Sequence, residues 1–247
     1  MKERRFKLET TSFALHTMAM VFMLLDHLWG TVMSGNDWMT CVGRLAFPIY
    51  AFLLVEGYFH TRNLKKYVLR LLLFAVISEI PFNLALGRRL FYPVHQNVLW
   101  SFLIAIGLIH WNEELRSRAY WLRILVGILS VCLGYVLGLV TFVDYYHAGI
   151  LMILTFYFFR NRKWWSYIGQ ALCLWYINLE MLGGYSYEVQ LFGQTHFIVR
   201  QGFALFALLP IWLYRGNQGY HSKAWQYFNY LFYPLHLLIL GIIMQFL

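Results

Sequence analysis

The chain has 247 residues, of which 60% are hydrophobic and only 13% are charged. Soluble domains carry about 25% charged residues, so this composition excludes a sizeable soluble domain and predicts a polytopic membrane protein. The net charge of +9 does not indicate nucleic-acid binding, because the basic residues fall in short loops between apolar stretches.

Nine apolar stretches follow one another along the chain, and several approach the roughly 20 residues that a helix needs to cross a bilayer. They cover residues 11–33, 39–59, 66–86, 95–111, 120–140, 145–160, 164–180, 197–214 and 225–246. The sequence therefore predicts an all-α bundle of about nine transmembrane helices in one domain, residues 1–247. The first stretch resembles a signal peptide, but it carries Asp26 and His27 and lacks a small-residue cleavage site, so we expect it to be retained.

The basic residues alternate between the loops as the positive-inside rule expects for nine spans. The segments expected inside hold Lys2, Arg4, Arg5, Lys7, Arg62, Lys65, Lys66, Arg70, Arg116, Arg118, Arg123, Arg160, Arg162, Lys163, Arg215 and Lys223, and those expected outside hold only Arg88 and Arg89. We therefore expect a cytoplasmic N-terminus and an extracytoplasmic C-terminus.

Residues 44–84 contain two apolar helices joined by a basic hairpin at 60–66. Arg44 and Glu56 lie on the first helix, and Arg70 and Glu79 lie on the second. A charged side chain at bilayer depth costs roughly 2.5–3.5 kcal/mol on insertion scales, so each is a candidate for a functional site. Internal ion pairs that join the helices are the structural alternative.

Polar residues from six predicted helices fall at similar depths in the outer half of the membrane. They are Asp26, His27, Arg44, Glu79, Asn97, Asp144, His147 and Arg200. Lipid cannot solvate such a layer, so we expect it to face a protein interior or a wet cavity. Adjacent residues on a helix point about 100° apart, so Asp26 cannot be assumed to orient His27.

A second polar set lies deeper or toward the expected inner side, namely Glu56, His60, Arg62, Arg70 and His236. In the last span, Asn229, Tyr233 and His236 recur at spacings of four and three and form one stripe. A basic inner mouth below a polar chamber favours an anionic ligand from the cytosol, because arginines suit phosphates. The ordinary positive-inside bias is the alternative explanation. Residues 181–196 are expected to form a loop that caps the chamber or is simply solvated.

Familiar catalytic motifs are absent from the sequence. It has no P-loop, HExxH, GxSxG or Rossmann glycine pattern. Two histidines and two carboxylates share the predicted layer, but no ligand spacing supports a metal site, so we expect none.

The order of short motifs resembles the TraX family of integral membrane proteins. The matching segments are LDH at 25–27, RLAFPIYAF at 44–52, EG at 56–57, RN at 62–63, SEIPF at 78–82, QNV at 96–98, DY at 144–145, QGFA at 201–204 and YPLH at 233–236. One departure is Tyr146, where the family pattern has glycine. The named member is implicated in N-terminal acetylation of conjugative pilin.

The resemblance implies a bacterial cytoplasmic-membrane enzyme that transfers an acyl group from acetyl-CoA or another acyl-CoA to an amine or hydroxyl of a small molecule, glycan or peptide. His27 is the expected general base. Asp26 and Glu79 would orient it or pair with Arg44 and Arg200, and Asn97 or Arg44 would stabilise the oxyanion. The expected substrate and CoA contacts are Glu56, Arg62, Arg70, Asp144, His147, Arg200, Tyr233 and His236. The lipid bilayer is a further partner, and oligomers remain open.

Other functions stay open from the residues alone. Intramembrane carboxylates and histidines are typical of proton-coupled transporters, although the sequence has no inverted repeat or paired broken helices. A structural assembly factor would not need six helices to share a polar layer. His27 can also be a helix-packing residue bonded to a neighbouring span.

Overall fold

The computed structural model describes residues 9–191 and 193–247. Its elements are α1 (Ser12–Gly30), α2 (Asp37–Gly43), α3 (Ala46–His60), α4 (Leu64–Gly87), α5 (Val98–Glu114), α6 (Tyr120–Val140), α7 (Tyr146–Phe158), α8 (Trp164–Trp175), a π-helical turn (Tyr176–Leu182), β1 (Ser186–Leu191), β2 (Gln194–Val199), a 3₁₀ helix (Arg200–Ala207), α9 (Leu208–Leu213) and α10 (Lys223–Ile243). Each of the nine predicted stretches contains at least one of these helical segments, and 39–59, 164–180 and 197–214 each contain two. The four basic residues expected at the inner side before Leu8 lie outside the described residues.

Side-chain caps start several helices where the sequence changes from polar to apolar. Thr11 accepts a hydrogen bond from the backbone N–H of Ala14, and Asn63 accepts one from that of Lys66. Ser222 does the same at the start of α10. Such caps satisfy backbone donors that have no partner inside the helix.

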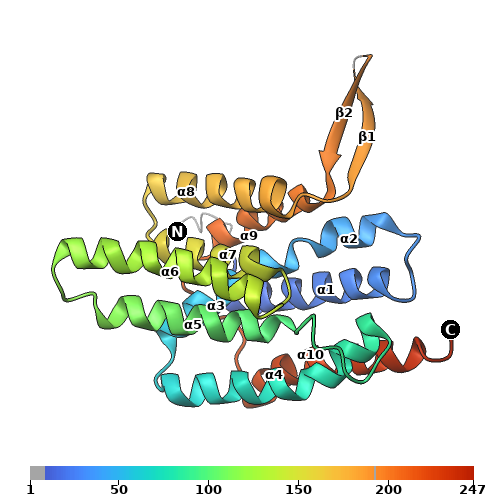
Figure 1. Cartoon of the computed structure of the whole chain (residues 1–247), viewed down its shortest axis with the longest axis horizontal. Coiled ribbons are helices and arrows are strands. Elements are labelled where there is room, and N and C mark those ends of the chain that lie inside the picture. Colours follow the sequence, from blue (N-terminus) through green and yellow to red (C-terminus); the bar gives the residue numbers. More distant parts are fainter. Residues whose placement is uncertain (1–8, 192) are drawn as a thin grey trace, which may run out of the picture.

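The helices lie roughly side by side along the long axis and are staggered, with α5 and α6 reaching further left than α1 and α10 (Figure 1). Helix α7 is central, and Ile150, Met152 and Ile153 are fully buried there. They join a core that also includes Ile49 of α3 and Ile109 of α5. We call the end with loops 61–63, 115–119, 159–163 and 214–222 the basic end, and the end with loops 31–36, 88–97 and 183–185 the hairpin end.

Apolar side chains also cover the outside of the bundle. Trp121 and Ile128 on α6 are more than half exposed, as are Leu73 on α4 and Ile239 on α10. In the part of the chain that the structure describes, five helical segments are long and apolar enough to cross a membrane: Ser12–Gly30, Asp37–His60, Leu64–Gly87, Tyr120–Val140 and Lys223–Ile243. Water would not favour such a surface. The chain is therefore a mostly helical membrane protein.

Strands β1 and β2 form an antiparallel hairpin that projects from the bundle (Figure 1). Tyr187 pairs with Ile198, and Val189 pairs with His196. The expectation of a loop over 181–196 was therefore wrong for most of that range. Alternating β-branched and aromatic residues favour strands, and Gly193 supplies the positive φ of +75° that the turn requires.

Candidate functional site

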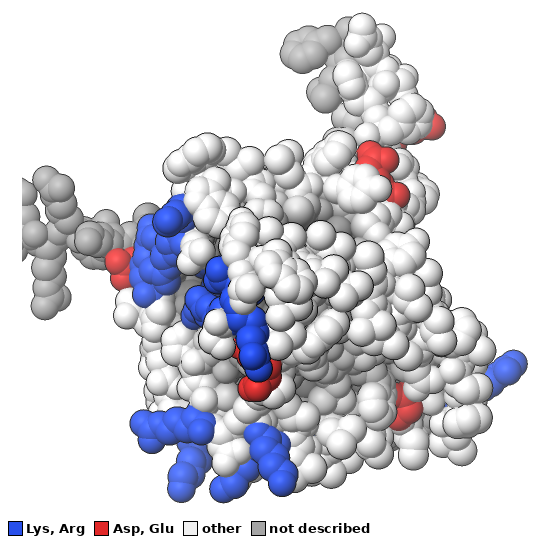
Figure 2. Space-filling view, turned by 60° about the vertical axis from the view of Figure 1, so that its left-hand side comes forward, with Lys and Arg blue, Asp and Glu red and all other residues white. Residues whose placement is uncertain are grey.

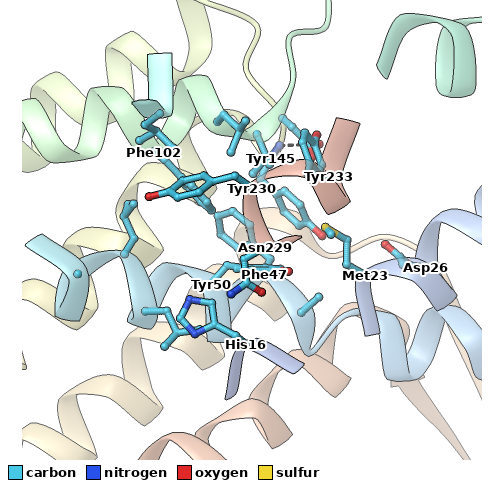
Figure 3. Close-up of a pocket in the computed structure, with 18 of the residues that line it drawn as sticks. His16, Met23, Asp26, Phe47, Tyr50, Phe102, Tyr145, Asn229, Tyr230 and Tyr233 are labelled. Atoms are coloured by element: carbon cyan, nitrogen blue, oxygen red, sulfur yellow. Dashed lines mark hydrogen bonds between the residues drawn. The ribbon is translucent and has the colours of Figure 1, made fainter. Parts of the chain in front are cut away.

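A cavity of about 1220 Å³ lies between α1, α3, α4 and α10. Residues from both the first and the last turn of α1 line it, so it follows a helix about 28 Å long. Arg62, Arg70 and His221 line its basic end, and Trp29 and Tyr185 line its hairpin end. Figure 3 shows side chains of α1, α3 and α10 facing one another across this space.

Nine of the thirteen predicted site residues line the cavity. They are Asp26, His27, Arg44, Glu56, Arg62, Arg70, Asp144, Arg200 and Tyr233. The remaining four, Glu79, Asn97, His147 and His236, are not among the lining residues. Most of the residues that the sequence predicts to share a polar interior therefore line one cavity. The other four have different contacts.

Asp26 of α1 pairs with Arg44, which lies between α2 and α3. One guanidinium nitrogen donates to both carboxylate oxygens of Asp26. Thr40, which is fully buried, donates its hydroxyl to the same carboxylate at 2.7 Å. Ion pairing of Asp26 with Arg44 was one of the two predicted roles, and it is the one that the structure has.

A network of side-chain hydrogen bonds extends from Arg44 to residues in the second half of the sequence. Arg44 donates to the side-chain oxygen of Gln201 at 3.3 Å, and Gln201 donates to Asn178 at 3.0 Å. Asn178 lies fully buried in the π-helical turn and donates to the carbonyl of Leu174. The guanidinium of Arg44 is therefore held by Asp26 on one side and by Gln201 on the other. Gln201 stands in the QGFA segment of the sequence, but Asn178 carried no signal that could have identified it.

Gly43 allows α1 and α2 to approach closely beside this pair. A Cβ atom at Gly43 would lie 2.5 Å from the Cβ of Asp26, which no real structure tolerates. The ion pair therefore depends on the absence of a side chain at residue 43.

His27 bonds to His236, from the opposite end of the chain. Its Nδ1 lies 2.7 Å from Nε2 of His236, and the Nδ1 of His236 lies 2.6 Å from the carbonyl oxygen of Phe232. His236 is 7% exposed and does not line the cavity. The structure therefore corrects its assignment to the deeper set and to the CoA path: it belongs to the same layer as His27 and lies behind it.

Glu79 and Asn97 form a cluster of their own. Asn97 donates its side-chain N–H to Glu79 and to the carbonyl of Ala75, and its oxygen caps the start of α5. Trp100 also donates to Glu79, at 3.0 Å. Neither residue contacts His27, so the expected orientation of His27 by Glu79 and the expected oxyanion contact from Asn97 have no support here. Their bonds join α4 to α5.

Asp144 lies in the turn between α6 and α7 and contacts His95 at 3.4 Å. The hydrogen bond to Asp144 raises the pKa of His95 above its ordinary value of 6.5. His147 instead packs its ring on Tyr135 at 4.4 Å and does not line the cavity. Asp144 and His147 therefore do not act together, although they are three residues apart.

At the basic end, Glu56 accepts a bond from Arg160 at 2.7 Å and lies 3.8 Å from His60. Arg70 lies over the ring of Tyr230 at 5.5 Å. Arg62 and Arg70 also line a smaller pocket of about 390 Å³ that adjoins this end. Glu56 is thus neutralised by Arg160, a residue that the sequence predicts only as part of an inner loop. No ion pair is found for Arg62 or Arg70 among the described residues.

At the hairpin end, Arg200 lies between two aromatic rings. Its guanidinium is 4.6 Å from the ring of Trp29 and 5.6 Å from that of Tyr185. Trp29 in turn donates its indole N–H to Asp37 at 3.0 Å. This end of the cavity therefore combines aromatic faces with a positive charge.

A metal site finds no support in the described part of the chain. No group of three or more histidine, cysteine, aspartate or glutamate side chains lies close enough there to hold a metal ion. The arrangement suits acid–base chemistry and anion binding.

Comparison with known proteins places the chain in a family. It is 29% identical over 248 residues to the probable fimbrial assembly protein FimC, serogroup H1, of Dichelobacter nodosus, with 94% of this chain and 95% of that protein covered. It is also 30% identical over 147 residues to protein TraX of Escherichia coli, with 58% of this chain and 54% of that protein covered. The match to protein TraX of strain K12 is 32% identical and covers 52% of that protein. No solved structure matches the chain. A family model described as TraX protein matches residues 12–244, so the chain belongs to the TraX family.

Proposed function

We propose that this protein is a membrane-embedded acyltransferase. It moves an acetyl or other short acyl group from cytosolic acyl-CoA to an amine or hydroxyl acceptor, and His27 is the general base. The observation that carries the proposal is one cavity that holds His27, has arginines at its basic end and has an aromatic wall at its hairpin end.

The orientation in the membrane follows from the distribution of charge. We infer that all nine predicted stretches cross the bacterial cytoplasmic membrane, with the N-terminus inside and the C-terminus outside. Figure 2 turns the left-hand end of Figure 1 forward, and the visible lysines and arginines gather mainly there. This distribution supports a cytoplasmic basic end, because basic loops stay inside.

The donor enters from the basic end. Arg62 and Arg70 line both the cavity and the adjoining pocket. Guanidinium groups bind phosphate oxygens through paired hydrogen bonds. The phosphates of CoA would stay at this mouth, while the thioester reaches along the cavity toward His27.

The reaction uses His27 to take the proton of the acceptor. The acceptor nitrogen or oxygen forms a bond to the thioester carbonyl carbon, its proton passes to His27, and the carbon–sulfur bond breaks. The CoA thiolate then takes up that proton. A general base within hydrogen-bond reach contributes typically about 10²- to 10⁴-fold to such a step. Arg44 is the remaining candidate for the oxyanion contact, because it lines the cavity whereas Asn97 does not.

The acceptor enters from the hairpin end, where Trp29, Tyr185 and Arg200 meet. One relative is named a probable fimbrial assembly protein, and the family is linked to modification of pilin. A fibre subunit with a free N-terminal amine is therefore one acceptor that the proposal includes.

Acyl transfer by the purified protein tests this proposal. We expect CoA release from acetyl-CoA in the presence of an amine or hydroxyl acceptor, and we expect His27→Ala to lower the rate at least about 100-fold. His110→Ala is the matched control, because His110 is half exposed, bonds to Tyr58 and does not line the cavity. Full activity of a folded His27→Ala protein would refute the assignment of the base.

A cavity lined from the first to the last turn of α1 also fits a small-molecule transporter, which is the competing candidate. A transporter would carry its substrate across the membrane without releasing CoA from acetyl-CoA. The two functions therefore predict different results in the CoA-release assay and in thermal unfolding with CoA.

A further inference from the structure

One hydrogen bond joins the rings of His27 in α1 and His236 in α10, 209 residues apart. His236 makes no contact with the cavity, so it is available to act on His27 but not on a ligand. The contacts of these two rings determine where their protons lie.

The carbonyl oxygen of Phe232 determines which nitrogen donates in each hydrogen bond of the His27–His236 pair. A carbonyl can only accept, so Nδ1 of His236, 2.6 Å away, must carry a proton. In a neutral imidazole the other nitrogen then has a lone pair and accepts. Nε2 of His236 therefore accepts from Nδ1 of His27, and this leaves Nε2 of His27 unprotonated.

The ring geometry supports a strong bond between the two side chains. The ring planes differ by only 10°, and the centroids are 5.0 Å apart. The 2.7 Å between the bonded nitrogens accounts for more than half of that spacing, so the rings meet edge to edge in nearly one plane rather than face to face. The lone pair of a ring nitrogen lies in the ring plane, as a linear hydrogen bond requires.

We propose that His236 is a positioning residue for His27. It holds His27 in the Nδ1–H tautomer, so that the free Nε2 can take the proton of the acceptor. When His27 becomes charged, its Nδ1–H bond to His236 becomes charge-assisted and stronger. This inference rests on the proposed function for its catalytic consequence, but not for the tautomer itself.

Two variants of His236 test the catalytic part. His236→Ala removes the acceptor, and we expect kcat to fall about 100-fold with little change in KM for acetyl-CoA. His236→Gln places an amide oxygen near the same position, and we expect it to recover a large part of kcat. A protein whose His236→Ala variant is folded and fully active, or whose Gln variant is folded and as impaired as the Ala variant, would overturn the proposal.

Nitrogen NMR of protein labelled with ¹⁵N-histidine tests the tautomer without any acyl donor. We expect His27, assigned with a His27→Gln sample, to carry its proton on Nδ1, and we expect His236→Gln to preserve that state. A proton on Nε2 of His27 in the unaltered protein would refute the positioning role. If no acyl transfer is found, the proposed function fails, while the NMR result still decides the proton arrangement.

Discussion

Gly43 lies where α2 passes closest to Asp26, and no side chain fits between them. Its missing Cβ is what lets Arg44 reach the carboxylate of Asp26 while also touching Gln201. The side chains of this pair are 19% and 15% exposed, so removal of one partner should cost less than the roughly 3–5 kcal/mol typical of a fully buried pair. Small displacements at this residue therefore affect a larger network.

The substitution Gly43→Ala tests this close approach. We expect the free energy of unfolding to fall by about 1–3 kcal/mol, because an overpacked site forces its neighbours to move. Thermal unfolding in detergent measures it, with Gly107→Ala in α5 as the control. Nothing lies within 4 Å of a Cβ at Gly107, so that substitution should be neutral or slightly stabilising. Equal melting temperatures for the two variants would contradict the tight packing.

The sequence predicts the depth of individual residues in the membrane but not which residues they contact. Counting along apolar stretches put His27 and Arg44 at one level, and both line the cavity. The same counting separated His236 from His27, although the two bond directly. Helix α10 ends at Ile243, only two turns after His236, so His236 lies near the hairpin end. Contacts between helices also depend on the direction in which each side chain points around its helix axis, and depth along the helix does not give that direction.

At the scale of elements, the predicted stretch 39–59 is divided into α2 and α3 at Arg44 and Leu45. Pro48 favours a break here but does not by itself require one, since Pro81 and Pro234 lie inside α4 and α10 without dividing them. In a continuous helix its ring would clash with the carbonyl of Arg44, four residues earlier, and that carbonyl would lose its hydrogen bond. In the first turn of α3 the missing N–H of Pro48 costs nothing. The proline was visible in the sequence, but apolarity alone predicted one uninterrupted span.

Other elements could be predicted only as helix or loop. The stretch 197–214 begins as a 3₁₀ helix, and 164–180 continues into a π-helical turn that positions Asn178. The two turns bring Gln201 and Asn178 within 3.0 Å of each other, and apolar periodicity does not predict such irregular geometry. Helix ranges were therefore predictable to within a few residues, whereas the irregular turns that hold Gln201 and Asn178 were not.

The contact of His95 with Asp144 joins loop 88–97 to the turn before α7, and it makes stability depend on pH. The raised pKa of His95 means that its stabilisation is complete below the ordinary value of 6.5. It is lost as pH rises through the higher pKa of the folded state. Both side chains are about one-third exposed, so solvent screening limits the effect to about 0.2–1 kcal/mol.

We therefore expect His95→Gln to lower the melting temperature more at about pH 6 than at about pH 9. Thermal unfolding in detergent at both pH values measures the difference. His196→Gln in β2 is the control, because His196 is exposed and no ion pair is found for it in the described part of the chain. If His95→Gln lowers the melting temperature by the same amount at both pH values, the proposed role of His95 is contradicted.

At the scale of the whole molecule, the fold separates two kinds of polar residue that the sequence grouped together. One kind lines the cavity, as Asp26, His27 and Arg44 do. The other joins helices, as Glu79 and Asn97 do between α4 and α5. Both kinds avoid lipid equally well, so neither composition nor periodicity could tell them apart.

The cavity also predicts how the whole molecule responds to the donor. If CoA binds at the basic end, CoA at 100 times its dissociation constant should stabilise the folded protein by about 2.7 kcal/mol. Thermal unfolding in detergent with and without CoA should then show a rise of several degrees. The double substitution Arg62→Gln with Arg70→Gln should remove most of that rise, because both guanidinium groups line the mouth of the cavity.

Arg118→Gln is the matched control, since it removes a positive charge from loop 115–119 without touching the cavity. Its response to CoA should equal that of the unaltered protein. Dephospho-CoA should stabilise less than CoA if the arginines bind phosphate, because one phosphate contact is absent. A transporter with no affinity for CoA would show no rise in any of these proteins, and that result would exclude CoA as the donor.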